Sequence, residues 1–214
     1  MNDSQTLLDP VRAIGRPLRL YFIRHGETAW SVSGEHTGRT DLPLTPRGEA
    51  MAHRLRVTLQ GFAFSLVLTS PRVRARATCA LAGLGADAQV EPLLAEWDYG
   101  SYEGLRTAGI HTLRPAWNVW ADGCPGGEMP ADVSVRADRL ITRLSGLAGN
   151  VALFSHGQFG RALAARWIGL PVAQGQHFAI DPASISMLSF ENEHPERPVI
   201  SLWNATALNM DTAA

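Results

Sequence analysis

Three apolar, strand-like runs of this sequence lead directly into basic side chains. They are residues 18–23 before Arg24-His25, residues 65–70 before Arg72, Arg74 and Arg76, and residues 151–154 before Ser155-His156. Parallel strands end at the same edge of a sheet, where ligands bind, so we expect these side chains to converge. A neutral imidazole is a good nucleophile, and planar guanidinium groups match phosphate oxygens. The pattern therefore favours phosphoryl-transfer chemistry.

The arginines after residue 70 fall on different faces of one predicted helix. Ser70-Pro71 is typical of a helix start, and the helix is predicted to reach Leu81. Arg72 and Arg76 share a face at spacing i, i+4, which we interpret as solvated, whereas Arg74 lies about 200° round from Arg72. A cation in the first helical turn opposes the helix dipole unless an anion is present. Arg74 therefore indicates a bound phosphate.

Two further stretches could complete such a site. His156-Gly157 lies where a strand passes into a helix, and the backbone N–H groups at such a junction bind anions. His156 could donate to the same anion. A proton donor is expected within residues 96–104, but spacing alone does not rank its three acids, which are Glu96, Asp98 and Glu103.

The elements that must position these residues alternate along the chain. Strands are predicted at residues 18–23, 65–70, 151–154, 184–190 and 198–203, and helices at 45–59, 71–81, 131–147 and 158–168. Thr45 is the expected N-cap of the first helix, with Pro46 at its first position. This order predicts an α/β fold: a single-domain, three-layer α/β/α sandwich with a mostly parallel sheet.

The composition is that of an ordinary globular chain. Its 214 residues carry a net charge of −1, which provides no basic surface for nucleic acid or membranes. No apolar run approaches the ~18 residues of a membrane span. The start of the chain lacks a signal-peptide apolar region, so we interpret residues 1–16 as an N-terminal arm, residues 17–214 as the domain, and the protein as cytoplasmic. Cys79 and Cys124 are interpreted as buried thiols.

Five motifs, taken in order, resemble those of the histidine phosphatase superfamily, also called phosphoglycerate-mutase-like. They are Arg24-His25-Gly26-Glu27-Thr28, residues 42–48 (LPLTPRG), Ser70-Pro71-x-x-Arg74-Ala75-x-x-Thr78, Glu96-x-x-x-Gly100-x-x-Glu103-Gly104 and Ser155-His156-Gly157. The resemblance covers residues 18–168 and implies a phosphoglycerate-mutase-like fold, a site without metal and no cofactor. It implies that His25 is the nucleophile and that Glu96 is the proton donor. It also implies a phosphate clamp of Arg24, Arg74 and His156.

A narrower likeness concerns the substrate. Many members carry asparagine shortly after the nucleophile, where this chain has Ser31. The stretches 30–41 and 96–104 look like the sedoheptulose-1,7-bisphosphatase branch, which implies contacts from Ser31 and Thr37 to substrate or phosphate. We therefore expect a sugar bisphosphate, with Arg39 meeting its second phosphate and Tyr102 donating a hydroxyl.

Three other functions fit part of the pattern. A cofactor-dependent phosphoglycerate mutase shares the core, and Gly126-Gly127-Glu128 is similar to a mutase segment. The short chain and the fourth motif, which ends with Glu103-Gly104, favour a phosphatase instead. A phosphate-binding protein without catalysis would not need the complete residue set. A metal hydrolase would suffer from two arginines that repel a divalent cation. The expected partner is a small phosphate ester, and the oligomeric state stays open, a homo-oligomer included.

Overall fold

The computed structural model describes residues 17–206, so the predicted arm of residues 1–16 lies outside the described part. Its centre is a six-stranded sheet in the order β3-β2-β4-β1-β5-β6. The strands are β1 (Arg19–Arg24), β2 (Leu66–Thr69), β3 (Ala88–Val90), β4 (Asn150–Ser155), β5 (Ile185–Glu191) and β6 (His194–Ala205). The first four are parallel to one another, while β5 runs antiparallel to both β1 and β6.

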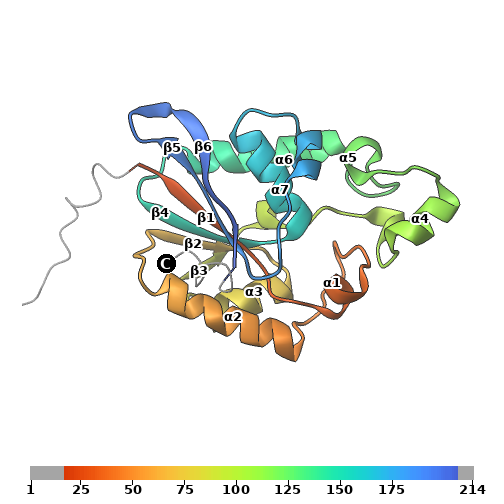
Figure 1. The fold of residues 1–214 in the computed structure, drawn as a ribbon, viewed down its shortest axis with the longest axis horizontal. Helices are drawn as coiled ribbons and strands as arrows, with labels where there is room; N and C mark the ends of the chain where they lie inside the picture. Colours follow the sequence, from red (N-terminus) through yellow and green to blue (C-terminus); the bar gives the residue numbers. More distant parts are fainter. Residues whose placement is uncertain (1–16, 207–214) are drawn as a thin grey trace, which may run out of the picture.

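Helices cover both faces of this sheet (Figure 1). On one face lie α2 (Pro46–Leu59) and α3 (Val73–Leu81), and on the other α6 (Pro130–Leu144) and α7 (Gly157–Trp167). Three short helices gather beyond one end of the sheet, namely α1 (Ala29–Ser33), α4 (Thr107–Leu113) and α5 (Val119–Asp122). The predicted α/β sandwich with a mostly parallel sheet is therefore confirmed.

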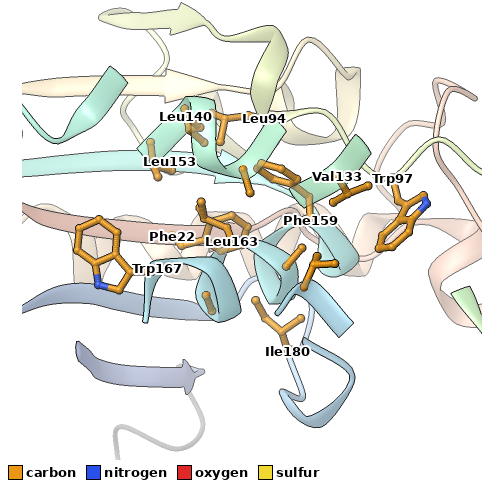
Figure 2. Close-up of a cluster of buried hydrophobic side chains, with 14 of the residues drawn as sticks. Phe22, Leu94, Trp97, Val133, Leu140, Leu153, Phe159, Leu163, Trp167 and Ile180 are labelled. Carbon is orange, nitrogen blue, oxygen red and sulfur yellow. The ribbon is translucent and has the colours of Figure 1, made fainter. Parts of the chain in front are cut away.

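Alternating side chains of the central strands fill the two layers. In β1, Leu20 and Phe22 belong to the core beneath α6 and α7, whereas Tyr21 and Ile23 pack in the cluster that contains α2 side chains. Figure 2 shows Phe22 of the sheet against Phe159 and Leu163 of α7. Because successive strand residues point to opposite faces, an apolar run in which every residue is buried requires a covered sheet.

The predicted elements are present with small shifts at their ends. Thr45 caps α2 as expected, since its Oγ1 accepts the Gly48 N–H at 3.0 Å. The predicted start at Ser70-Pro71 is wrong, because α3 begins at Val73. The Asp41 carboxylate accepts the Val73 N–H at 2.6 Å, so this helix start already has an anion of the protein's own.

The segments 29–33 and 86–130 carry elements that periodicity did not predict: α1, β3, α4 and α5. Each is short, and their segments are rich in Gly, Pro and Trp or lie within motifs. Short elements depend on contacts with the rest of the fold, so the sequence pattern alone is weak there. Within residues 17–206, no helix is both long and apolar enough to cross a bilayer.

Candidate active site

His25 lies just beyond β1, at the carboxyl end of the parallel strands, and lines a cleft of about 250 Å³. Its backbone N–H donates to Ser155 O of the neighbouring segment at 2.9 Å. The next residue must be glycine, because a Cβ on Gly26 would lie 2.5 Å from Gly48 O. This contact between two backbones holds His25 at the start of the loop that follows β1.

The contacts and burial of the His25 ring favour the neutral imidazole. Nδ1 lies 2.7 Å from Gly26 O, and because a carbonyl only accepts, Nδ1 carries the proton and Nε2 the lone pair. Burial lowers the pKa of the His25 imidazole well below its usual value, and the charges of Arg74 and Arg24 lower it further. The neutral, reactive form therefore predominates at neutral pH.

Arg24 offers a buried donor beside His25. Its Nη1 donates to Ile180 O at 2.6 Å, but its Nε is buried without a hydrogen-bond partner anywhere in residues 17–206. A Cβ on Gly157 would lie 3.3 Å from this Nε, so the arginine lies against the first residue of α7. A guanidinium N–H next to a helix N-terminus is well suited to an anion.

Arg74 and His156 lie behind His25, and both are fully buried. Arg74 Nε donates to His156 Nδ1 at 3.2 Å, which leaves the His156 Nε2 proton for Ser70 Oγ at 2.7 Å. Burial, followed by the charge of Arg74, holds the pKa of His156 well below its usual value. The rings of His25 and His156 have centroids 5.1 Å apart. The structure thus brings the predicted clamp together, although in this conformation neither side chain lines the cleft.

The outer end of the Arg74 guanidinium binds the loop that follows α1. Its Nη1 donates to Thr40 O at 2.9 Å, and its Nη2 donates to Thr37 O at 3.0 Å and to Gly38 O at 3.2 Å. The resemblance implied that the Arg74 N–H groups bind phosphate, but in this structure they are bound to these three carbonyls. Arg74 therefore also determines where Thr37 lies in the cleft.

Of the three candidate acids, Glu96 alone lines the cleft. Its Oε1 accepts the Phe159 N–H at 2.8 Å, and its Oε2 accepts the Gln158 N–H at 3.0 Å, so the carboxylate lies on the N-terminal turn of α7. Asp98 instead pairs with an arginine, and Glu103 accepts backbone N–H groups of residues 38 and 40. The geometry thus ranks three acids that spacing left equal.

The predicted substrate contacts divide into two groups. Ser31, Thr37 and Gly157 line the cleft. Neither Arg39 nor Tyr102 is among the described residues that line the cleft. The Arg39 side chain is 70% exposed and its Nη2 lies 2.6 Å from Asp98 Oδ2, while the Tyr102 ring packs on Trp117 with centroids 5.2 Å apart. We therefore assign no substrate contact to Arg39 or Tyr102.

Two basic side chains in the cleft were missed from the sequence. Arg161 is four residues after Gly157, and this i, i+4 spacing could have placed it on the same face of α7. His36 lies beside the rings of Tyr99 and Trp117, at centroid distances of 4.6 and 5.4 Å. Nothing in its sequence neighbourhood indicated this aromatic environment, because Trp117 is distant in the chain.

Comparison with known proteins identifies relatives of this chain. The sequence profile of the histidine phosphatase superfamily (branch 1) matches residues 20–206. An acid phosphatase of Mycobacterium tuberculosis is 45% identical over 188 residues, which are 86% of this chain and 92% of the relative. A sedoheptulose 1,7-bisphosphatase of Saccharomyces cerevisiae is 37% identical over 186 residues, which are 72% of this chain and 69% of the relative.

A solved structure gives the same result for the fold. The product of an open reading frame from Mycobacterium tuberculosis superposes with a TM-score of 0.81 at 42% identity, covering 89% of this chain and 99% of the other. The chain therefore belongs to branch 1 of the histidine phosphatase superfamily, which confirms the phosphoglycerate-mutase-like fold and the phosphoric monoester hydrolase class predicted from its motifs.

Proposed function

We propose that this chain hydrolyses a sugar phosphate through a phosphohistidine formed at His25. The observation that carries the proposal is the pairing of two groups at one edge of the sheet. His25 is neutral with its Nδ1 proton held by Gly26 O, and the buried Arg24 Nε next to it has no partner within residues 17–206. A phosphate ester would supply both the electrophile for His25 and the acceptor for Arg24.

The reaction follows in two displacements. In the first, His25 Nε2 attacks phosphorus, the bond to the ester oxygen breaks, and Glu96 gives its proton to the leaving alkoxide. In the second, Glu96 takes a proton from water as the water oxygen attacks phosphorus, and His25 leaves. Arg24 neutralises the equatorial oxygens together with the backbone N–H of Gly157, because the N–H groups of Gln158 and Phe159 are bound to Glu96. Arg74 and His156 contribute from behind His25, and each must exchange a present partner to touch the phosphate.

A sugar bisphosphate is the substrate that we propose. The support is the yeast relative, whose name is sedoheptulose 1,7-bisphosphatase, together with a second cation in the cleft, Arg161. The Arg161 guanidinium is held by Gly175 O at 3.0 Å and Gln158 Oε1 at 2.7 Å, so it is fixed in place for a distant phosphate. Such a charge-assisted contact is worth about 1.5–3 kcal/mol, roughly tenfold to a hundredfold in kcat/KM.

Fructose-1,6-bisphosphate is therefore expected to be hydrolysed with a higher kcat/KM than fructose-6-phosphate or fructose-1-phosphate. Phosphate release to water is the measurement, and transfer to an added sugar acid instead would indicate a mutase. Arg161→Met should reduce the preference, whereas Arg39→Ala, on the exposed Asp98 pair, should retain it. Equal kcat/KM for the three substrates in the wild type would eliminate the bisphosphate assignment and leave a broad phosphatase.

Activity is expected to survive exhaustive treatment with EDTA. The physical reason is that Arg24, Arg74 and the start of α7 can supply the positive charge that a metal would bring to the phosphate. Among the described residues, no three His, Cys, Asp or Glu side chains form a group that could hold a metal ion. Phosphate release before and after chelation is the assay, and loss of turnover that Mg²⁺ or Zn²⁺ restores would refute the expectation.

A further inference from the structure

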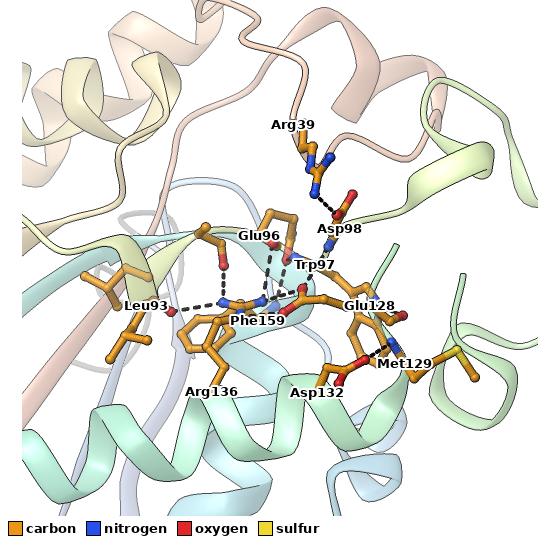
Figure 3. A network of polar contacts seen from close by, with 12 residues as sticks. Arg39, Leu93, Glu96, Trp97, Asp98, Glu128, Met129, Asp132, Arg136 and Phe159 are labelled. Atoms are coloured by element: carbon orange, nitrogen blue, oxygen red, sulfur yellow. Dashed lines mark hydrogen bonds and ion pairs between the residues drawn. The ribbon is translucent and has the colours of Figure 1, made fainter. Parts of the chain in front are cut away.

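An ion pair lies beneath the proposed acid and outside the cleft (Figure 3). Arg136 of α6 binds Glu128 through both carboxylate oxygens, with Nε to Oε1 at 2.7 Å and Nη2 to Oε2 at 2.8 Å. The two side chains are only 14% and 20% exposed. Two-pronged pairs of this kind hold their partners in one geometry.

Arg136 also binds the backbone that leads to Glu96. Nη1 donates to Leu93 O at 2.9 Å and to Ala95 O at 2.6 Å, and Nη2 lies 3.4 Å from Glu96 O. The guanidinium carbon is 4.3 Å from the centre of the Phe159 ring, and the N–H of the same Phe159 donates to Glu96 Oε1. One arginine thus contacts both the backbone of Glu96 and the residue that orients its carboxylate.

Glu128 binds the backbone on the other side of Glu96. Its Oε2 accepts the Asp98 N–H at 2.9 Å, its backbone N–H donates to Asp98 O at 2.9 Å, and its carbonyl accepts the Trp97 indole N–H at 2.9 Å. A Cβ on Gly127 would lie 2.2 Å from Asp98 O. In the Gly126-Gly127-Glu128 motif, Gly127 therefore lets the two backbones approach closely, and Glu128 places its carboxylate against the segment that carries the acid.

We propose that Arg136 and Glu128 are positioning residues for Glu96. Together they hold the backbone before, at and after Glu96, while α7 holds its carboxylate. A general acid must lie within hydrogen-bond reach of the leaving oxygen, and a small displacement of such a group lowers the rate about a hundredfold. The inference rests on the proposed function, because it acts through the acid role of Glu96.

The test compares two substrates of similar size. Benzyl phosphate has an alkoxide leaving group that needs a proton, whereas p-nitrophenyl phosphate has one that barely needs it. We expect Arg136→Met and Glu128→Gln to lower kcat/KM for benzyl phosphate about tenfold to a hundredfold, and for p-nitrophenyl phosphate about threefold or less. This quantity reports formation of the phosphohistidine, so slow hydrolysis of the intermediate does not obscure it.

The matched control is a second two-pronged pair, which links α7 to α6. Arg166 binds Asp138 of α6, with Nε to Oδ1 at 2.8 Å and Nη2 to Oδ2 at 3.1 Å, away from the cleft. Arg166→Met should leave the ratio of the two kcat/KM values unchanged. Urea unfolding of each variant measures any loss of stability, and Glu128→Gln, which preserves the side-chain shape, decides the question if Arg136→Met does not fold.

A double variant separates positioning from a general structural effect. In the Glu96→Gln background, Arg136→Met should produce no further change in the ratio, because the group it positions is no longer an acid. If Glu96→Gln alone lowers the ratio while Arg136→Met and Glu128→Gln do not, the positioning inference is overturned and the proposed function stands. If Glu96→Gln itself leaves the ratio unchanged, the acid assignment fails, and the inference fails with it.

Discussion

Replacing His25 with alanine is expected to reduce turnover about 10⁴-fold or more, because the proposed covalent intermediate forms on its Nε2. In the wild type, Nδ1 is held by Gly26 O and burial keeps the ring neutral, so Nε2 is ready to attack. Rapid quenching with a ³²P-labelled phosphate ester should trap an acid-labile phosphoryl group on the wild-type protein and none on His25→Ala.

The control for this variant is His53→Ala, which changes an exposed histidine of α2. It should retain both the trapped intermediate and the rate. Wild-type phosphate release by His25→Ala would show that the proposed mechanism is wrong, whatever the substrate.

Glu96→Gln is the second substitution with a large expected effect. General acid catalysis is typically worth ~10²–10⁴-fold, so kcat/KM for sugar phosphates should fall by this order, while p-nitrophenyl phosphate loses little. The glutamine preserves the side-chain length and can still accept one of the N–H groups at the start of α7, which limits structural change. Initial rates on both substrates, over a range of concentrations, are sufficient to measure the difference.

The neighbouring acids provide the comparison. Asp98→Asn weakens the contact with Arg39, and Glu103→Gln weakens the contacts to residues 38–40, so each should lower the rates on both substrates by a similar factor. If Glu96→Gln lowers the rates on both substrates equally, the proton donor is one of these two acids, Glu35, which also lines the cleft, or a water molecule. The structure favours Glu96 because it alone of the three lines the cleft.

Much of this site was predictable from local pattern. Buried runs bounded by Gly or Pro predicted β1, β2 and β4, and the placement of His25 and His156 just after two of these strands predicted their convergence. The N-cap at Thr45 was likewise predictable, because its contact is with Gly48, only three residues away. Such features depend on hydrogen bonds and apolar periodicity within one segment, which the order of residues determines directly.

Other features depended on which distant segments came into contact. The anion expected at the start of α3 is the Asp41 carboxylate, thirty-two positions earlier in the chain. Arg39, expected at the substrate, pairs with Asp98 at the surface instead. A charged side chain has several partners of suitable chemistry within reach, and the packing of the backbone decides which one it meets.

The choice of Glu96 over Asp98 and Glu103 has the same physical origin. All three acids lie in one short stretch, and their spacing alone does not rank them, although the resemblance to the family motif implies Glu96. The difference arises because Arg136, forty positions further on, binds Glu96 O, and because α7 presents its N-terminal N–H groups to the Glu96 carboxylate. The sequence by itself determined the central strands, the longer helices and, through its motifs, the candidate residues of the site, whereas only the packing of α6 and α7 on the sheet decided how the Glu96 carboxylate is held in the cleft.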